Sequence, residues 1–119
     1  MCARLKSWVF DPSPAALHEG PEDFVLHVRF FAGPADGPGE ESFDLTVCSP
    51  EWLAATCRRV GLYDARHHLV VNADEFDQHE LIRWLAKRVD SVSGGTWSEI
   101  GAKLGRLGHW ELEDYNGPN

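Results

Sequence analysis

The chain has 119 residues, which suffice for one domain and are too few for two cores of ordinary size. Its 43% hydrophobic residues exclude an intrinsically disordered protein. The formal net charge of −8 argues against direct binding to nucleic acid or to an anionic membrane, since both repel an acidic protein. We therefore expect one domain over residues 1–119, with electrostatic attraction toward a basic protein partner.

Cysteine usage and hydropathy indicate the compartment. Cys2, Cys48 and Cys57 are odd in number and form no C-x-x-C pair, which argues against a disulfide framework and a thiolate zinc site. No apolar stretch approaches the roughly 20 residues that span a bilayer. Asp11 and Pro12 interrupt the N-terminal sequence before a signal-peptide core forms. We expect a cytoplasmic protein.

The N-terminal half has the alternation of antiparallel strands. A first strand is predicted from Ala3 to Phe10. From Phe24 to Phe31 and again from Glu41 to Cys48, every second residue is apolar, which is typical of strands with one buried face. The Gly- and Pro-rich residues 33–39 between them favour a turn. These two strands are therefore expected to form a hairpin.

A helix is predicted directly after the hairpin. Ser49 is a suitable N-cap, Pro50 suits the first turn, and Gly61 is a typical stop. Apolar and small residues recur on one side at helical spacing, and we expect that side to be buried. The predicted inner stripe consists of Trp52, Leu53, Thr56, Cys57 and Val60.

A further strand and a second helix are predicted next. The strand runs from Arg66 to Asn72, and Asp74 is the expected N-cap of the helix. The glycine pair at 94–95 is expected to end that helix. Its predicted apolar face consists of Leu81, Ile82, Leu85 and Val89.

The last predicted helix starts at the capping-box sequence from Thr96 to Glu99 and stops at Gly108. Gly101 and Gly105 each weaken a helix by about 1 kcal/mol relative to alanine, which suggests that another segment packs closely there. The tail from His109 to Tyr115 alternates and is predicted to be a short closing strand.

Strands that precede most of the helices favour an α+β fold. We predict a single domain with a mainly antiparallel sheet of about four to five strands and about three helices packed on one face. His27, Arg29 and Phe31 would then lie on the opposite, uncovered face. Such a face either binds a partner or stays hydrated.

Candidate catalytic groups are few. His67, His68 and His79 are ligand types that zinc accepts, and Glu80 follows the last of them, but adjacent strand residues point to opposite faces. Cys48 precedes a helix start, where a thiolate would be stabilised, yet no histidine is adjacent to it. Packed or solvated histidines and small buried cysteines explain these residues more simply. The sequence predicts no enzyme, no metal site and no cofactor.

Negative charge is gathered in three groups. The acids between residues 74 and 80 are explained by the start of a helix, where carboxylates are favoured. The other two groups lie on the predicted hairpin and in the tail, the latter beside Trp110 and Tyr115. Acids next to aromatic side chains are typical of an interface for a basic protein. The predicted contact residues are Glu40, Glu41, Asp44, Glu111, Glu113 and Asp114.

Three segments resemble the immunity protein 8 family: residues 42–53 (SFDLTVCSPEWL), 96–100 (TWSEI) and 108–115 (GHWELEDY). They occur in the expected order, and the resemblance covers the chain from Ala3 to Tyr115. Members are small bacterial immunity proteins encoded in polymorphic toxin and contact-dependent inhibition loci. The resemblance implies a cytoplasmic, cofactor-free inhibitor that binds a cognate toxin domain, expected to be a nuclease with a basic cleft.

Two alternatives remain open at this point. The first is a non-catalytic binding module or homodimeric scaffold unrelated to toxins, which would use the uncovered face of the sheet. The second is a small metal-dependent enzyme, which rests only on the three histidines named above.

Overall fold

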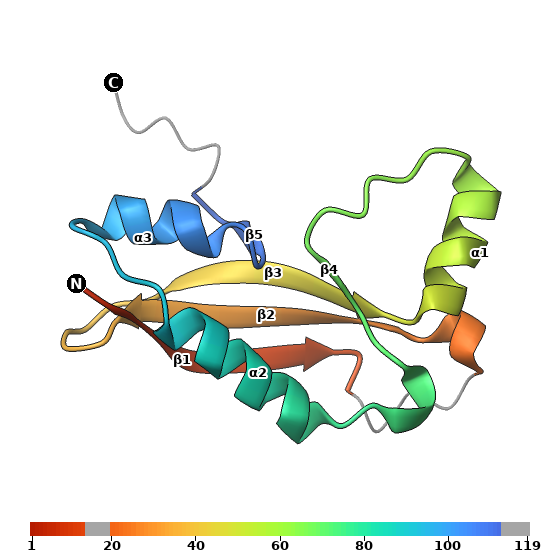
Figure 1. The fold of residues 1–119 in the computed structure, drawn as a ribbon, viewed down its shortest axis with the longest axis horizontal. Coiled ribbons are helices and arrows are strands. Elements are labelled where there is room, and N and C mark those ends of the chain that lie inside the picture. The colour runs from red at the N-terminus through yellow and green to blue at the C-terminus, as the bar shows by residue number, and fades with distance from the viewer. Residues whose placement is uncertain (14–19, 113–119) are drawn as a thin grey trace.

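The structure is a computed structural model that describes residues 1–13 and 20–112. It is an α+β fold in which a five-stranded, mostly antiparallel sheet is accompanied by three α-helices, as the sequence predicts (Figure 1). No helix in this part of the chain has the length and hydropathy needed to cross a membrane. The strands are β1 (Ala3–Asp11), β2 (Val25–Pro34), β3 (Glu41–Cys48), β4 (His68–Val70) and β5 (His109–Trp110). The helices are α1 (Pro50–Val60), α2 (Gln78–Asp90) and α3 (Trp97–Leu104), with 3₁₀ turns η2 (Pro21–Asp23) and η3 (Ala73–Glu75).

The sheet has the order β1-β2-β3-β4, and β5 also pairs with β3. β1 with β2 and β2 with β3 are antiparallel, and Phe30 lies opposite Phe43 in the hairpin that the sequence predicts. β4 pairs with β3 in parallel along residues 46–48, whereas β5 pairs antiparallel at Phe43 and Asp44. Both short strands therefore share one edge of β3, and β1 forms the opposite edge of the sheet.

β2 continues beyond its predicted end at Phe31. Its last residues, Gly33 and Pro34, pair with the first residues of β1, a partner that local sequence does not reveal. The turn of the hairpin therefore begins later than predicted. Gly33 is required at its position because the carbonyl of Gly39 lies where a Cβ would be.

The core lies between one face of the sheet and the helices α2 and α3. Phe30 stacks on Phe43 with ring centroids 5.2 Å apart, and Phe43 stacks on Trp110 at 6.3 Å. Such aromatic pairs contribute about 1 kcal/mol each beyond the area they bury. The fully buried side chains include Leu26, Val28, Phe30, Phe43, Val47, Leu85, Val89, Ile100 and Leu104.

α1 begins and ends as predicted, but its buried side differs. The Oγ of Ser49 accepts a hydrogen bond from a first-turn amide at 3.0 Å, and Gly61, with φ of 83°, follows the last helical residue. The predicted stripe is wrong at Cys57 and Val60, which are exposed, while Thr56 is buried. The reason is position, because α1 lies at the end of the sheet against η2 rather than over the sheet face (Figure 1).

The start of α2 also corrects the sequence prediction. The N-cap is Asp77, whose carboxylate accepts a hydrogen bond from a first-turn amide at 2.8 Å, and not Asp74. Residues 73–75, where the helix was expected to begin, form the separate turn η3. Between η3 and α2, Phe76 packs edge-on against Phe24 with 5.2 Å between ring centroids. This long-range contact fixes where the helix can start.

β4 is shorter than the predicted strand over 66–72. His67 has a left-handed φ of 60°, and the side chain of Asn72 caps η3. A strand needs extended backbone to keep its ladder of hydrogen bonds, so His67 cannot belong to it. Asn72 has extended backbone but lies at the start of η3, beyond the residues paired with β3. The parallel pairing to β3 is consequently confined to His68–Val70.

α3 begins at the predicted cap and ends early. The Oγ1 of Thr96 accepts a hydrogen bond from the Glu99 amide at 3.2 Å. The helix ends at Leu104 instead of at Gly108. The close packing expected at Gly101 is confirmed, since a Cβ there would lie 2.5 Å from the ring of Trp110.

Candidate functional site

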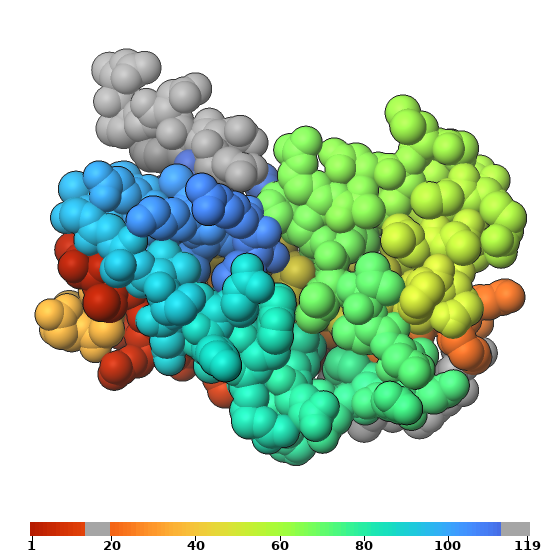
Figure 2. Space-filling view, in the orientation of Figure 1, coloured from red at the N-terminus to blue at the C-terminus, as the bar shows by residue number. Residues whose placement is uncertain are grey.

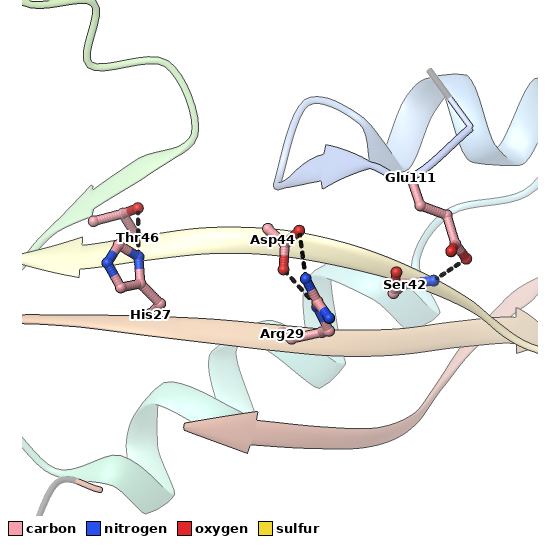
Figure 3. Close-up of polar contacts among 6 residues, drawn as sticks. All are labelled: His27, Arg29, Ser42, Asp44, Thr46 and Glu111. Carbon is pink, nitrogen blue, oxygen red and sulfur yellow. Dashed lines mark hydrogen bonds and ion pairs between the residues drawn. The ribbon is translucent and has the colours of Figure 1, made fainter. Parts of the chain in front are cut away.

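The face of the sheet opposite α2 and α3 is not covered by any described element. Alternation along β2 places His27, Arg29 and Phe31 on this face, as the sequence predicts. We call it the open face, and Figure 3 shows several of its polar contacts. Its residues on β1, β2 and β3 include Val9, Asp11, His27, Arg29, Phe31, Asp44 and Thr46.

A hollow of 410 Å³ lies on the open face, lined by six of these residues from three strands. Val9 is 57% exposed although it is apolar, and Phe31 beside it is half-buried. Asp11 and Asp44 lie in the same hollow. The surface therefore combines apolar area with carboxylates, which suits a protein partner better than a small catalytic substrate.

Asp44, one of the predicted contact residues, is held by an ion pair. The Nε of Arg29 donates to the Oδ1 of Asp44 at 2.8 Å, and its Nη2 donates to Oδ2 at 3.4 Å (Figure 3). The pKa of Arg29 is raised first by this hydrogen bond, then by the charge of Asp44 and more weakly by that of Glu111. Both side chains are about half exposed, at 58% and 48%, so solvent screens the pair. The pair orders Asp44 on the open face more than it stabilises the fold.

Glu111, a second predicted contact, lies at the edge of β3 beside this ion pair. Its amide donates to the Ser42 carbonyl at 3.1 Å, and its Oε1 accepts from the Ser42 amide at 2.7 Å (Figure 3). The Glu111 carboxylate thus binds the Ser42 amide, which the backbone carbonyl of a longer β5 would otherwise bind. Its carboxylate is fixed in position beside the open face.

Glu41 and Glu40 do not join that arrangement. Glu41 lies two residues before Phe43 on β3, so both side chains point to the helix side of the sheet. There the carboxylate of Glu41 accepts a hydrogen bond from the indole of Trp110. Glu40 and Glu41 line a separate hollow with Trp97. The remaining predicted contacts, Glu113 and Asp114, lie outside the described residues. The structure therefore brings two of the six predicted residues together, Asp44 and Glu111.

The histidines considered as metal ligands have structural hydrogen bonds. His67 donates through Nε2 to the carbonyl of Gly105 at 2.7 Å. His68 donates through Nδ1 to the Arg66 carbonyl at 2.8 Å, so its Nε2 accepts from the hydroxyl of Tyr63 at 2.6 Å. Desolvation raises the pKa of Tyr63, which keeps the hydroxyl proton available for this bond. Within residues 1–13 and 20–112, no three His, Cys, Asp or Glu side chains are grouped to hold a metal ion.

The two cysteines of interest differ in their environment. Cys48 is buried, as predicted, and burial raises the pKa of its thiol. The raised pKa disfavours the thiolate, which is the nucleophilic form. Cys57 is exposed on α1, contrary to the prediction that it is a small core residue. Cys48 therefore acts as part of the core.

A second concave surface lies on the helix side and was not predicted. We call it the β4–α2 groove; it has a volume of 330 Å³. Three acids of the group around Asp74 line it, although a helix start alone is enough to explain that group in the sequence. The signal in the sequence is Phe76, an aromatic residue that lies between these acids. The lining residues are Leu69, Val71, Asn72, Glu75, Phe76, Asp77, Glu80, Leu81 and Trp84.

Comparison with known proteins relates the chain to one described family. A family model described as Immunity protein 8 matches residues 4–115. The match includes all three segments on which the sequence resemblance rests. No curated protein and no solved structure matches the chain.

Proposed function

The chain belongs to the immunity protein 8 family, and we propose that it binds the nuclease domain of a cognate polymorphic toxin through the acidic open face of its sheet. Membership of the family implies toxin neutralisation by a non-catalytic inhibitor whose partner is a cognate toxin. The nuclease class of the target and the contact surface are the finer parts of the proposal. The match over residues 4–115 is the observation that carries it.

Net charge supports a nuclease as the target. A nuclease attracts phosphate backbones with a basic cleft, and a protein of net charge −8 is attracted to the same cleft. Opposite charges accelerate association, and salt reduces the gain. We therefore expect fast association with the toxin and a strong dependence of its rate on ionic strength.

The composition of the open face supports it as the contact surface. Val9 and Phe31 offer apolar area, and Asp44 adds charge on the same face. Protein interfaces usually combine apolar area with polar and charged groups. The other sequence-predicted contacts also stay in the proposal. Glu111 lies beside this face, Glu40 and Glu41 line the separate hollow near Trp97, and Glu113 and Asp114 lie outside the described residues.

Growth rescue tests the function directly. The toxin domain encoded beside this gene is expressed alone and together with the full chain in the same bacterial host. We expect toxicity from the toxin alone, rescue by the chain, and purification of a one-to-one complex. Toxicity that persists while the chain is expressed in folded form would contradict the proposal.

A matched pair of lysine substitutions tests the open face. Val9→Lys places a charge in the proposed contact, whereas Leu62→Lys makes a similar change at a residue that is 93% exposed and does not belong to the open face. We expect Val9→Lys to raise the Kd for the toxin at least about tenfold, since it buries an unpaired charge. Leu62→Lys is expected to leave the Kd within about twofold. Equal effects of the two variants would remove the open face from the interface.

A homodimer through the open face is a second candidate arrangement. The 57% exposure of Val9, an apolar residue on an uncovered strand, favours some partner at this position. Analytical ultracentrifugation over a wide range of concentrations tests it. A concentration-dependent dimer that Val9→Lys abolishes would support self-association, and a monomer throughout would exclude it.

A further inference from the structure

The β4–α2 groove lies between β4, which is a strand of the sheet, and α2, which packs on one face of the sheet. Figure 2 shows this side of the molecule, where the teal residues of α2 adjoin the green segment that carries β4 and η3. Five of its nine lining residues are large apolar side chains, and its 330 Å³ can receive the side chain of a partner residue. The apolar lining residues are Leu69, Val71, Phe76, Leu81 and Trp84.

The walls of the groove are held in place by contacts behind them. Phe76 packs edge-on against Phe24, and Leu81 is only 6% exposed in the core. The ring of Trp84 lies under the guanidinium of Arg88, 5.5 Å from the ring centroid. Side chains fixed in this way lose little conformational entropy on binding. The groove is therefore preformed.

The rim of the groove is acidic. Glu75, Asp77 and Glu80 line it, and no lysine or arginine is among the lining residues. Glu80 has only a loose contact with Arg83, 3.9 Å between nitrogen and oxygen and about 70% exposed on both sides. Among the described residues, the carboxylate of Glu75 makes neither a hydrogen bond nor an ion pair, and only its amide is bonded, to the Asn72 carbonyl at 3.2 Å. A partner would therefore need basic groups beside the apolar side chain that enters the groove.

We propose that the β4–α2 groove is a second toxin-contact site, which receives an apolar side chain flanked by lysine or arginine from the toxin. The proposal rests on the proposed function, because the toxin is the named occupant. It adds a contact on the side of the sheet opposite the open face. A bound toxin would then reach around one end of the molecule, or two segments of it would contact the two surfaces.

Two adjacent acids of η3 provide a matched test. Glu75 lines the groove, whereas the neighbouring Asp74 is exposed and does not. Glu75→Lys and Asp74→Lys change the net charge equally, and the Kd of each variant for the toxin domain is measured at about 150 mM salt, where the Debye length is about 8 Å. We expect Glu75→Lys to raise the Kd about tenfold or more and Asp74→Lys to raise it less than about threefold. Equal Kd values would overturn the proposal.

A spectroscopic measurement avoids any substitution in the bound protein. The full chain is labelled with 5-fluorotryptophan, and the resonance of Trp84 is assigned with Trp84→Phe. We expect that resonance to shift when the toxin domain is added, while that of Trp8, which lines a different hollow beside α2, stays in place. A Trp84 resonance that is unchanged in the complex would overturn the proposal. So would a shift that appears with rising protein concentration alone, since the occupant would then be a second copy of the chain.

The two proposals fail in distinguishable ways. Without rescue and without a complex, the proposed function fails and the groove proposal falls with it. With rescue and a complex, but with a silent Trp84 resonance and equal effects at Asp74 and Glu75, only the groove proposal is overturned.

Discussion

The open face and the β4–α2 groove are both acidic, but their carboxylates are used differently. On the open face the carboxylate of Asp44 forms an ion pair with Arg29. Beside this face the carboxylate of Glu111 accepts a hydrogen bond from the Ser42 amide. In the groove, Glu75 has no such partner among the described residues. A carboxylate that already has a partner inside the protein must exchange it before it can bind a new one. The difference shows that the number of acids in a segment does not measure the charge that it offers to a partner.

The largest expected change in stability comes from disturbing the contact between Gly101 and Trp110, which holds β5 and Glu111 beside the open face. Gly101→Val is expected to lower the free energy of unfolding by about 3 kcal/mol, because the new side chain must displace the ring of Trp110. The displaced ring would loosen β5 and with it Glu111, while the groove stays intact. Urea unfolding gives the free energy, and amide hydrogen exchange should rise at residues 109–111 but not in α2.

Ala102→Val is the control for that substitution, since Ala102 is the exposed neighbour in the same helix. Its expected cost is about 0.5 kcal/mol, from the lower helix propensity of valine. Similar costs for the two substitutions would mean that the contact between Gly101 and Trp110 is not tight in solution.

Breaking the start of α2 should affect the groove side by a smaller amount. Asp77→Ala is expected to lower the free energy of unfolding by about 1 kcal/mol, because it removes the N-cap. Asp74→Ala is the control and should change the free energy by less than about 0.5 kcal/mol. Thermal or urea unfolding measures both. A larger loss for Asp74→Ala would favour the helix start that the sequence predicts over the observed one.

The smallest expected effect is on the rate of association with the toxin, when a carboxylate on the open face loses its partner. Arg29→Gln leaves Asp44 unpaired and is expected to raise the toxin association rate about threefold at low salt. Arg66→Gln removes a more exposed arginine from its ion pair with Asp64, outside the open face, and is expected to change the rate by less than about 1.5-fold. Stopped-flow association gives both rates. A larger gain for Arg66→Gln would place the encounter surface elsewhere.

Local patterns predicted the parts of the fold that depend on near neighbours in the sequence. The β2–β3 hairpin follows from alternation, and the caps at Ser49 and Thr96 follow from side chains that bond the next turn. Asp74 was the wrong cap because the choice of Asp77 depends on Phe76 packing against a distant phenylalanine. The buried side of α1 was wrong for a similar reason, since periodicity does not reveal which element a helix packs against.

The candidate site was predictable only in part. The position of Asp44 on the open face follows from the alternation of β3. The same alternation places Glu41 with Phe43 on the helix side, so the sequence already indicates that Glu41 and Asp44 lie on opposite faces. The contact of Glu111 with Ser42 depends on β5 pairing with β3, which no local pattern encodes. The groove needs β4 and α2 side by side, and a parallel strand of three residues leaves almost no trace in the sequence.

The outer edge of β1 affects the tendency of the protein to aggregate at high concentration. A sheet edge with free amides can add strands from other molecules, which leads to aggregation. Here the amide of Ala3 donates to the Val92 carbonyl at 3.0 Å, and that of Leu5 donates to Asp90 at 3.2 Å. The register shift between Leu5 and Ser7 then interrupts the ladder. The N-terminal half of this edge is thus closed to intermolecular strand addition, which favours colloidal stability at high expression.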